Sequence, residues 1–239
     1  MTDHRWLAAG RTNERVGERA GVWSIVVAGG AGARFGGAVA KQYLSLGNAR
    51  VVDRSLSLMR SVCGDRVVLV VAPDRLGDHG TDATFVVVGG ATRSGSVRAG
   101  LAGVGPDAEI ILVHDAARPL VPNAVVSRLL AAIDAGADAA VPGLALKDTV
   151  KRVDASGLVL ETVDRASLMA VQTPQAFRAE VLRRVHEAGG EATDDAALVE
   201  ACGGRVVVVP GDPLARKVTT DEDLKWLRAH LDSINEADR

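Results

Sequence analysis

Short apolar runs alternate with longer amphipathic segments along most of the chain, and this alternation constrains the fold more than any other feature of the sequence. The apolar runs predict strands at 24–27, 67–72, 84–88, 109–114, 139–142 and 205–209. Helical periodicity between them predicts helices at 51–62, 94–103, 122–135, 178–188, 194–201 and 221–234. Pro122 suits a first helical position, and Thr220 with Asp223 forms a capping box for the last helix. Such alternation is typical of a mostly parallel sheet with helices on both faces, so we expect an α/β fold.

Residues 145–171 interrupt this alternation. Segments 149–153 and 158–163 are strand-like and flank the turn sequence Asp154-Ala155-Ser156-Gly157, which predicts an inserted β-hairpin. Because an isolated two-stranded ribbon is marginal in water, the hairpin needs a packing partner. We expect an arm that forms a homodimer with a second subunit, and packing on its own domain is the alternative.

Composition limits the possible partners. The chain of 239 residues is 47% hydrophobic, enough for one domain at 21–239, and the polar stretch at 1–20 is expected to be a flexible extension. A net charge of −2 with only 3% aromatic residues argues against nucleic acid. The sequence holds no membrane-length apolar run and no apolar core of a secretion signal. Cys63 and Cys202 lack metal-ligand spacing, and a reducing cytoplasmic location is consistent with single thiols.

A glycine-rich loop follows the first predicted strand. Its sequence is Ala28-Gly29-Gly30-Ala31-Gly32-Ala33-Arg34, and Lys41 comes shortly afterwards. Glycine lets backbone N–H groups converge closely on phosphate oxygens, while Arg34 and Lys41 add full positive charges. For the glycines alone an ordinary strand-to-helix turn is an equal alternative. The two cations favour a nucleotide site.

Two common nucleotide loops do not fit this segment. A Walker A loop ends in Gly-Lys-Ser/Thr, but here Gly37 is followed by Ala38. A dinucleotide fingerprint requires a third glycine where Phe35 stands. Its acidic residue would be Asp53, which falls inside a predicted helix rather than at a strand end. An ATPase loop is excluded and a dehydrogenase is disfavoured.

Further candidate residues follow other predicted strands. Asp115, in His114-Asp115-Ala116-Ala117-Arg118-Pro119, is placed at a carboxyl end where it can hold Mg²⁺ on a triphosphate, or else pair with Arg118. His114 is expected to be packed rather than a catalytic base. The segment Gly89-Gly90-Ala91-Thr92-Arg93-Ser94-Gly95-Ser96 offers backbone groups and the Ser96 hydroxyl for a base, with helix capping by Ser94 or Ser96 as the simpler role. Lys217 precedes the last helix, where a solvated lysine is the common alternative.

In order along the chain, several pieces resemble one family. They are Ala28-Gly29-Gly30-Ala31-Gly32-Ala33-Arg34, Lys41-Gln42-Tyr43-Leu44, Gly89-Gly90-Ala91-Thr92-Arg93-Ser94-Gly95-Ser96-Val97, His114-Asp115-Ala116-Ala117-Arg118-Pro119, Asp148-Thr149-Val150-Lys151-Arg152, Gln172-Thr173-Pro174-Gln175, Thr193-Asp194-Asp195-Ala196 and Lys217-Val218-Thr219-Thr220. Together they resemble the 2-C-methyl-D-erythritol 4-phosphate cytidylyltransferases. The resemblance implies a Rossmann-like nucleotidyltransferase fold, and transfer of CMP from CTP to methylerythritol phosphate in isoprenoid precursor biosynthesis.

The same resemblance implies roles for particular residues. It assigns charge stabilisation during catalysis to Arg34, Lys41 and Lys217, with Asp115 near the ribose and Mg²⁺. Nucleotide binding falls to Ala28, Gly29, Gly30, Gly32, Gly90, Ser96, Asp115 and Ala116. Binding of methylerythritol phosphate falls to Thr149, Arg165, Thr173, Thr193 and Arg118, with the arm crossing to the partner subunit of a homodimer.

Three alternatives stay open at this point. Ribitol 5-phosphate cytidylyltransferases share the loop and the His-Asp-Ala run, although the sequence from Thr193 to Glu200 is more similar to the isoprenoid enzyme. A sugar or molybdopterin nucleotidyltransferase shares the Ala-Gly-Gly loop but is not expected to carry Gln172-Thr173-Pro174-Gln175 and the arm. A non-catalytic nucleotide-binding protein would have no need to keep all three cations.

Overall fold

A computed structural model describes residues 17–30, 40–77 and 83–237 of the chain. One eight-stranded sheet forms its centre, and its seven-strand path runs in the order β10, β7, β11, β6, β1, β4, β5, with β12 also paired to β7. These strands are β1 (Val22–Val27), β4 (Val67–Val71), β5 (Phe85–Val88), β6 (Ile110–Asp115), β7 (Ala139–Ala145), β10 (Met169–Val171), β11 (Gln175–Arg178) and β12 (Val206–Pro210). All six strands expected from the apolar runs are present.

Parallel pairing dominates the sheet. Strand β1 pairs in parallel with β4 and β6, β4 pairs in parallel with β5, and β12 pairs in parallel with β7. The short strand β11 lies between β6 and β7 and is antiparallel to both, and β10 is antiparallel to β7. The carboxyl ends of β1, β5 and β6 therefore meet at one edge of the sheet, where open α/β sheets bind ligands.

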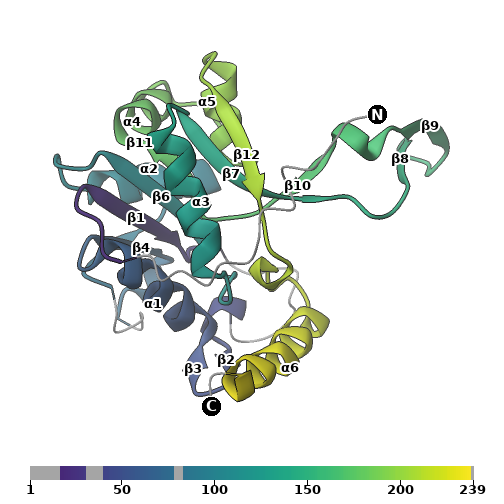
Figure 1. The fold of residues 1–239 in the computed structure, drawn as a ribbon. Coiled ribbons are helices and arrows are strands. Elements are labelled where there is room, and N and C mark those ends of the chain that lie inside the picture. The colour runs from purple at the N-terminus through teal and green to yellow at the C-terminus, as the bar shows by residue number, and fades with distance from the viewer. Residues whose placement is uncertain (1–16, 31–39, 78–82, 238–239) are drawn as a thin grey trace.

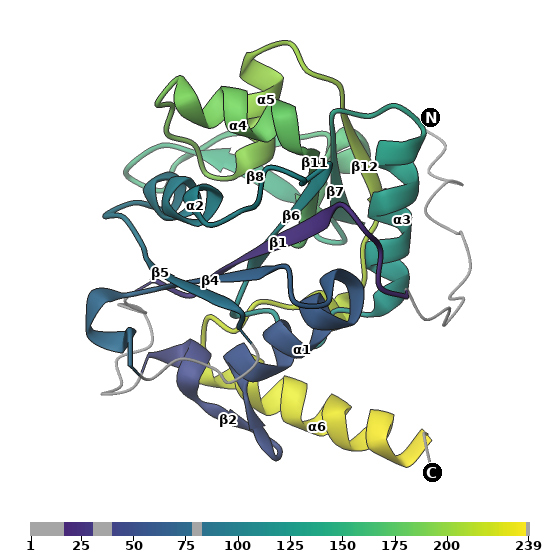
Figure 2. The same ribbon diagram turned by 90° about the vertical axis from the view of Figure 1, so that its left-hand side faces the viewer.

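Helices cover both faces of the sheet, and the side chains of each central strand alternate between two apolar cores. Val26 of β1 packs in the core that contains α1 (Val51–Cys63) and α3 (Asn123–Asp134), and Ile25 packs in the opposite core. The opposite core contains α2 (Arg93–Ala102), α4 (Ala179–Glu187) and α5 (Asp195–Ala201). Figure 2 shows α2, α4 and α5 on one side of the sheet and α1 on the other. These cores confirm the expected fold class.

The last helix, α6 (Asp221–Ala237), joins a third apolar cluster rather than the sheet. There it packs with the short hairpin of β2 (Ser45–Leu46) and β3 (Ala49–Arg50) through Leu46 and Leu227, both fully buried. The expected capping box is present, because the N–H of Thr220 donates to Asp223 at 3.0 Å and the N–H of Asp223 faces the Thr220 hydroxyl at 3.3 Å. Pro122 is the N-cap of α3 rather than its expected first helical residue, because the helix begins at Asn123.

The predicted hairpin is present as β8 (Val150–Val153) and β9 (Val159–Val163), which pair with each other in a separate two-stranded sheet. Figure 1 shows this arm projecting away from the central sheet. The arm is shorter than the expected range of 145–171, because β7 continues to Ala145 and pairs there with Met169 of β10 in the central sheet. We use "the arm" below for residues 146–168. Its exposed apolar residues include Leu158, which directly precedes β9, and Leu160 in β9.

The start of the described chain is attached to the domain, which corrects the expected limit of the flexible extension. Arg19 donates to both carboxylate oxygens of Asp134 at 2.8 and 2.7 Å, and its N–H donates to the carbonyl of Val62 at 3.0 Å. Glu18 pairs with Arg66 at 3.0 Å. Residues 17–20 therefore belong to the folded domain, whereas 1–16 lie outside the described residues. No helix in the described ranges is long and apolar enough to cross a bilayer.

Candidate active site

A cavity of about 450 Å³ lies at the carboxyl edge formed by β1, β5 and β6. Its lining comes from five separate parts of the sequence: Val27, Ala28, Gly29, Gly30, Lys41, Gln42, Gly90, Ala91, Thr92, Arg93, Ser96, Asp115, Ala116, Ala117, Lys217 and Thr219. The charged members of this lining are three cations and the single carboxylate of Asp115, so the described wall has a net charge of +2. The whole chain has a net charge of −2, and the positive field is therefore local to the cavity.

Backbone from two loops forms the uncharged part of the wall. The N–H of Ala28 donates to the carbonyl of Val70 at 2.7 Å, which keeps the exit of β1 in line with the sheet. At Gly90 an added Cβ would lie 2.8 Å from the backbone carbon of Gly95, so only glycine lets this loop pack against the start of α2. Thr92 is the N-cap of α2 and accepts from the N–H of Gly95, which corrects the expected capping by Ser94 or Ser96.

Asp115, the last residue of β6, is the centre of a charge cluster. Its Oδ2 accepts from Nζ of Lys217 at 2.7 Å, and Nε of Arg93 and Nε of Arg118 each lie 3.8 Å from one of its oxygens. Burial by itself raises the pKa of this carboxyl, but attraction to Lys217, Arg93 and Arg118 outweighs burial and lowers the pKa to about 2. Asp115 is therefore ionised at neutral pH and fixes the ammonium of Lys217 in the cavity.

A second buried carboxylate forms an ion pair with Arg93. Asp195, the first residue of α5, is fully buried, and its Oδ2 accepts from Nη1 of Arg93 at 2.7 Å. Its other oxygen lies 3.0 Å from Nε2 of His186, which α4 contributes. Burial lowers the pKa of Arg93, while Asp195, Asp115 and Asp194 raise it, and the net shift is upward. This chain of side chains connects the cavity to α4 and α5 on one face of the sheet.

Hydrogen bonds hold the loop that carries Lys217 both before and after this residue. Gln172 forms two hydrogen bonds with the backbone of Asp212, at 2.8 and 3.1 Å, and Arg118 donates to the carbonyl of Ala215 at 2.7 Å. Directly after Lys217, the N–H of Val218 donates to the carbonyl of Ala117 at 2.8 Å. Lys217 is therefore held by backbone and side-chain contacts before any ligand binds.

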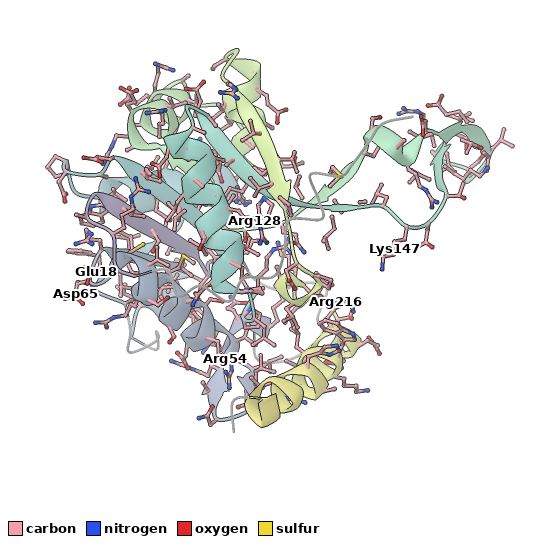
Figure 3. All side chains as sticks on the ribbon, viewed as in Figure 1. Glu18, Arg54, Asp65, Arg128, Lys147 and Arg216 are labelled. Atoms are coloured by element: carbon pink, nitrogen blue, oxygen red, sulfur yellow. The ribbon has the colours of Figure 1, made fainter. Side chains whose placement is uncertain are left out.

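Arg216, the residue before Lys217, turns away from the cavity toward α6. Its guanidinium lies 4.7 Å from the centre of the Trp226 ring and pairs with Asp223 at 3.3 Å. Figure 3 labels Arg216 beside this helix, apart from Lys147 on the arm. Arg216 and Lys217 are neighbours in the sequence, but Arg216 contacts α6 whereas Lys217 lines the cavity.

His114 has a structural role, as expected from its sequence. It is fully buried, and burial lowers its pKa to about 4, so the ring is neutral at pH 7. Its Nε2 faces the carbonyl of Arg118 and its Nδ1 faces the hydroxyl of Thr173, each at 3.2 Å. The Thr173 hydroxyl in turn accepts from the N–H of Asp115 at 3.0 Å. Thr173 therefore accepts a hydrogen bond from the backbone of Asp115 and is not among the lining residues of the cavity.

Most of the catalytic and nucleotide-binding residues expected from the sequence line this one cavity: Lys41, Lys217, Ala28, Gly29, Gly30, Gly90, Ser96, Asp115 and Ala116. Arg34 and Gly32 lie outside the described residues. The expected residues for the second substrate are not among the lining residues of this cavity: Thr149, Arg165, Thr173, Thr193 and Arg118. Of these, Thr149 and Arg165 are exposed residues of the arm, and Arg165 donates to the carbonyl of Lys147.

Among the lining residues that were not expected from the sequence, Gln42, Thr92 and Thr219 are the uncharged polar ones. Gln42 was part of a matching segment but had no role, and Thr92 and Thr219 look like ordinary capping residues. The available signal for Gln42 was its place directly after Lys41, in a segment whose next residue, Tyr43, is apolar enough to be buried. Burial of this turn would bring Gln42 next to the loop.

The sheet, its helices and a positively charged cavity at its carboxyl edge define a nucleotide-binding α/β protein of the nucleotidyltransferase type. The family model of 2-C-methyl-D-erythritol 4-phosphate cytidylyltransferase matches residues 22–233. The chain belongs to this family.

Similar proteins agree with this assignment. A 2-C-methyl-D-erythritol 4-phosphate cytidylyltransferase from Rhodococcus opacus is 45% identical over 217 residues, covering 88% of this chain and 95% of the relative. A bifunctional IspD/IspF enzyme from Clavibacter michiganensis is 46% identical, and the chain spans 53% of its length. Among solved structures, the enzyme from Thermus thermophilus matches with a TM-score of 0.74 and 32% identity, covering 87% of this chain and 97% of the other.

Proposed function

We infer that the chain transfers CMP from CTP to 2-C-methyl-D-erythritol 4-phosphate, forming 4-diphosphocytidyl-2-C-methyl-D-erythritol and releasing pyrophosphate. The observation that carries this function is the meeting of Lys41, Lys217 and the glycine-rich exit of β1 in one cavity of a chain from this family. In the reaction, an oxygen of the sugar phosphate attacks the α-phosphorus of CTP. The bond from that phosphorus to the bridging oxygen breaks, and its electron pair leaves with pyrophosphate.

Charge repulsion is the main obstacle to this reaction, because both reactants are polyanions. Two unit charges about 4 Å apart repel by about 4 kcal/mol at an effective dielectric constant near 20. We propose that Arg34, Lys41 and Lys217 neutralise these charges and stabilise the charge that builds up on the α-phosphate and on pyrophosphate. The attacking phosphate is already a nucleophile, so no general base is needed. The neutral, buried state of His114 agrees with that view.

The uncharged part of the cavity wall is suited to cytidine. The Ser96 hydroxyl donates to the carbonyl of Thr92 at 2.9 Å, so its lone pairs remain able to accept a hydrogen bond. We propose that it accepts from the amino group of cytosine while backbone of Ala28, Gly29 and Gly90 contacts the base. Gly30, Asp115 and Ala116 then lie toward the ribose. Gly32 is proposed to contact the phosphates.

Mg²⁺ is proposed to enter with CTP. Asp115 is the only carboxylate among the described lining residues, and its Oδ2 accepts from Lys217 at 2.7 Å. No cluster of three or more potential metal-ligating side chains occurs in the described ranges. The described donor set therefore does not fit a metal held by the protein, and Asp115 acts as the counterion of Lys217 rather than as a dedicated ligand. Phosphate oxygens of CTP are the fitting ligands for Mg²⁺.

We propose that the chain forms a homodimer through the arm and that the site for methylerythritol phosphate is shared. Exposed apolar side chains of the arm support this, since Leu158 and Leu160 are 65% and 58% exposed. Thr149 and Arg165 belong to the arm and are not among the lining residues of the cavity of their own chain, so we propose that they bind a sugar phosphate at the cavity of a partner. Arg118, Thr173 and Thr193 would complete this site from the domain.

The two cysteines support a cytoplasmic location, because both Cys63 and Cys202 are free thiols.

The function is tested by measuring pyrophosphate release with CTP and either 2-C-methyl-D-erythritol 4-phosphate or ribitol 5-phosphate. We expect release with the first acceptor and at least a hundredfold lower kcat/KM with the second. Preference for ribitol 5-phosphate would assign the chain to the related reaction, and release with neither acceptor would leave a nucleotide-binding protein without this activity.

A further inference from the structure

Gln42 is a buried amide that joins two parts of the cavity wall. Its Nε2 donates to the carbonyl of Ala28 at 2.7 Å and to the carbonyl of Gly30 at 3.1 Å. Gln42 itself is only 4% exposed and follows Lys41 directly in a short 3₁₀ helix, Lys41–Tyr43. One side chain therefore ties the exit of β1 to the segment that carries a cation of the cavity.

The two ends that Gln42 connects are separated in the chain by residues 31–39. On one side, Ala28 is fixed to the sheet through its hydrogen bond to Val70. On the other side, the 3₁₀ helix is fixed to α1, because the N–H of Val51 donates to the carbonyl of Leu44 at 3.0 Å. Gly29 and Gly30 have no side chains of their own to restrain their backbone, and glycine has the largest conformational freedom of any residue.

The chemistry of the amide suits this task. A carboxamide has two N–H donors on one nitrogen, so a single group can satisfy two carbonyl oxygens at once. A carboxylate of the same shape would oppose both carbonyls, and an apolar side chain would leave both without this donor. Since the group is buried, its hydrogen bonds are shielded from competing water.

We propose that Gln42 is a positioning residue for CTP: it holds the backbone of Ala28–Gly30 and the ammonium of Lys41 at the mutual placement that one nucleoside triphosphate needs. The amide bonds to the backbone that we propose to contact the base, and the cation that we propose to contact the phosphates is the residue before Gln42. If the amide is lost, each part of the wall can move independently, and a ligand that must contact both binds less well. This inference rests on the proposed function and adds a residue to it.

The test uses the full-length chain with Gln42→Met, which has nearly the same shape but no donor. We expect the Kd for CTP, measured by calorimetry, to rise at least tenfold. We also expect kcat to fall, while the KM for methylerythritol phosphate changes less than twofold. That split between the two substrates is not expected from a general loss of stability.

Arg183→Met is the matched control, because Nη2 of Arg183 also donates to two backbone carbonyls, those of Val104 and Gly105, at 3.1 and 3.0 Å. These carbonyls are not part of the cavity lining. The control should lower the melting temperature and leave the Kd for CTP within twofold of the parent chain. If Gln42→Met does not fold, Gln42→Asn keeps the donors on a shorter side chain and should still raise the Kd at least threefold.

An unchanged Kd for CTP in the folded Gln42 variant, or an equal rise in Arg183→Met, overturns the positioning role. This failure is distinct from failure of the proposed function. If the proposed function fails, the parent chain itself releases no pyrophosphate with either acceptor. Calorimetry still measures the Kd for CTP of the parent chain and of each variant, so the positioning role is tested separately.

Discussion

Replacing Asp115 with asparagine removes the negative charge at the centre of the cavity cluster while keeping the side-chain volume. In the parent chain the pKa of Asp115 is lowered from its ordinary 3.8 to about 2, with the attraction of Lys217, Arg93 and Arg118 outweighing burial. One pKa unit corresponds to about 1.4 kcal/mol, so the ionised carboxylate contributes about 2.5 kcal/mol to the free energy of unfolding at pH 7. The side chain is 12% exposed, so solvent screens little of this contribution.

The sign of the pH dependence follows from the direction of the shift. Because the folded pKa lies below the unfolded pKa, the stabilisation is complete well above pH 4 and is lost as the pH falls toward 2. At pH 3 about half of it, roughly 1.3 kcal/mol, remains. The difference in unfolding free energy between the parent chain and Asp115→Asn should therefore shrink from about 2.5 kcal/mol at pH 7 to about 1.3 kcal/mol at pH 3.

Urea denaturation at both pH values measures this difference. Asp74→Asn is the control, because Asp74 is a 75% exposed carboxylate whose nearest partner is Arg75 at 3.5 Å. Surface pairs of this kind contribute about 0–1 kcal/mol, so the control should change stability by less than about 0.5 kcal/mol. A difference for Asp115→Asn that is absent at pH 7, or that stays constant down to pH 3, would refute the electrostatic reasoning.

Three further predictions concern the second carboxylate, the arm and the second substrate. Asp195→Asn leaves Arg93 without its buried counterion at 2.7 Å and should lower the free energy of unfolding by about 3–5 kcal/mol in urea titrations; a loss below about 1 kcal/mol would contradict a buried ion pair. Leu158→Ser with Leu160→Ser should convert the proposed dimer to a monomer in light scattering, whereas Leu76→Ser, also at an exposed leucine, should not; an unchanged dimer would place the interface elsewhere. Arg165→Ala should raise the KM for methylerythritol phosphate far more than the Kd for CTP, and equal losses for both ligands would remove its assignment.

The sequence predicted the parallel part of the sheet because those strands appear as continuous apolar runs, and the central strands β1, β4 and β6 are buried on both faces. Strand β11 was not expected, since Gln175–Arg178 mixes polar and apolar residues and is buried by its neighbours β6 and β7. The expected end of β7 at 142 was too early, because Pro142 and Gly143 interrupt a strand pattern. In the structure, pairing with β10 and β12 continues the strand to Ala145.

The candidate site was predicted only in part, namely where its residues directly follow predicted parallel strands. A rule about sheet edges suffices to expect Asp115 near the glycine-rich loop, because both follow parallel strands. The partners that fix these groups depend on long-range contacts that no local pattern shows. Asp195 holds Arg93 from a different helix, and the ion pair of Arg19 with Asp134 joins the start of the described chain to α3. Such contacts become visible only in three dimensions.

The central claim is that cations distant in the sequence bind one triphosphate in one cavity. A crystal structure of the chain with CTP and Mg²⁺ tests it most directly. We expect the triphosphate between Lys41 and Lys217, with phosphate oxygens within hydrogen-bond distance of both ammonium groups and of Arg34, and cytosine against Gly90 and Ser96. Density for CTP at another place on the molecule, or a triphosphate that contacts neither lysine, would contradict the account.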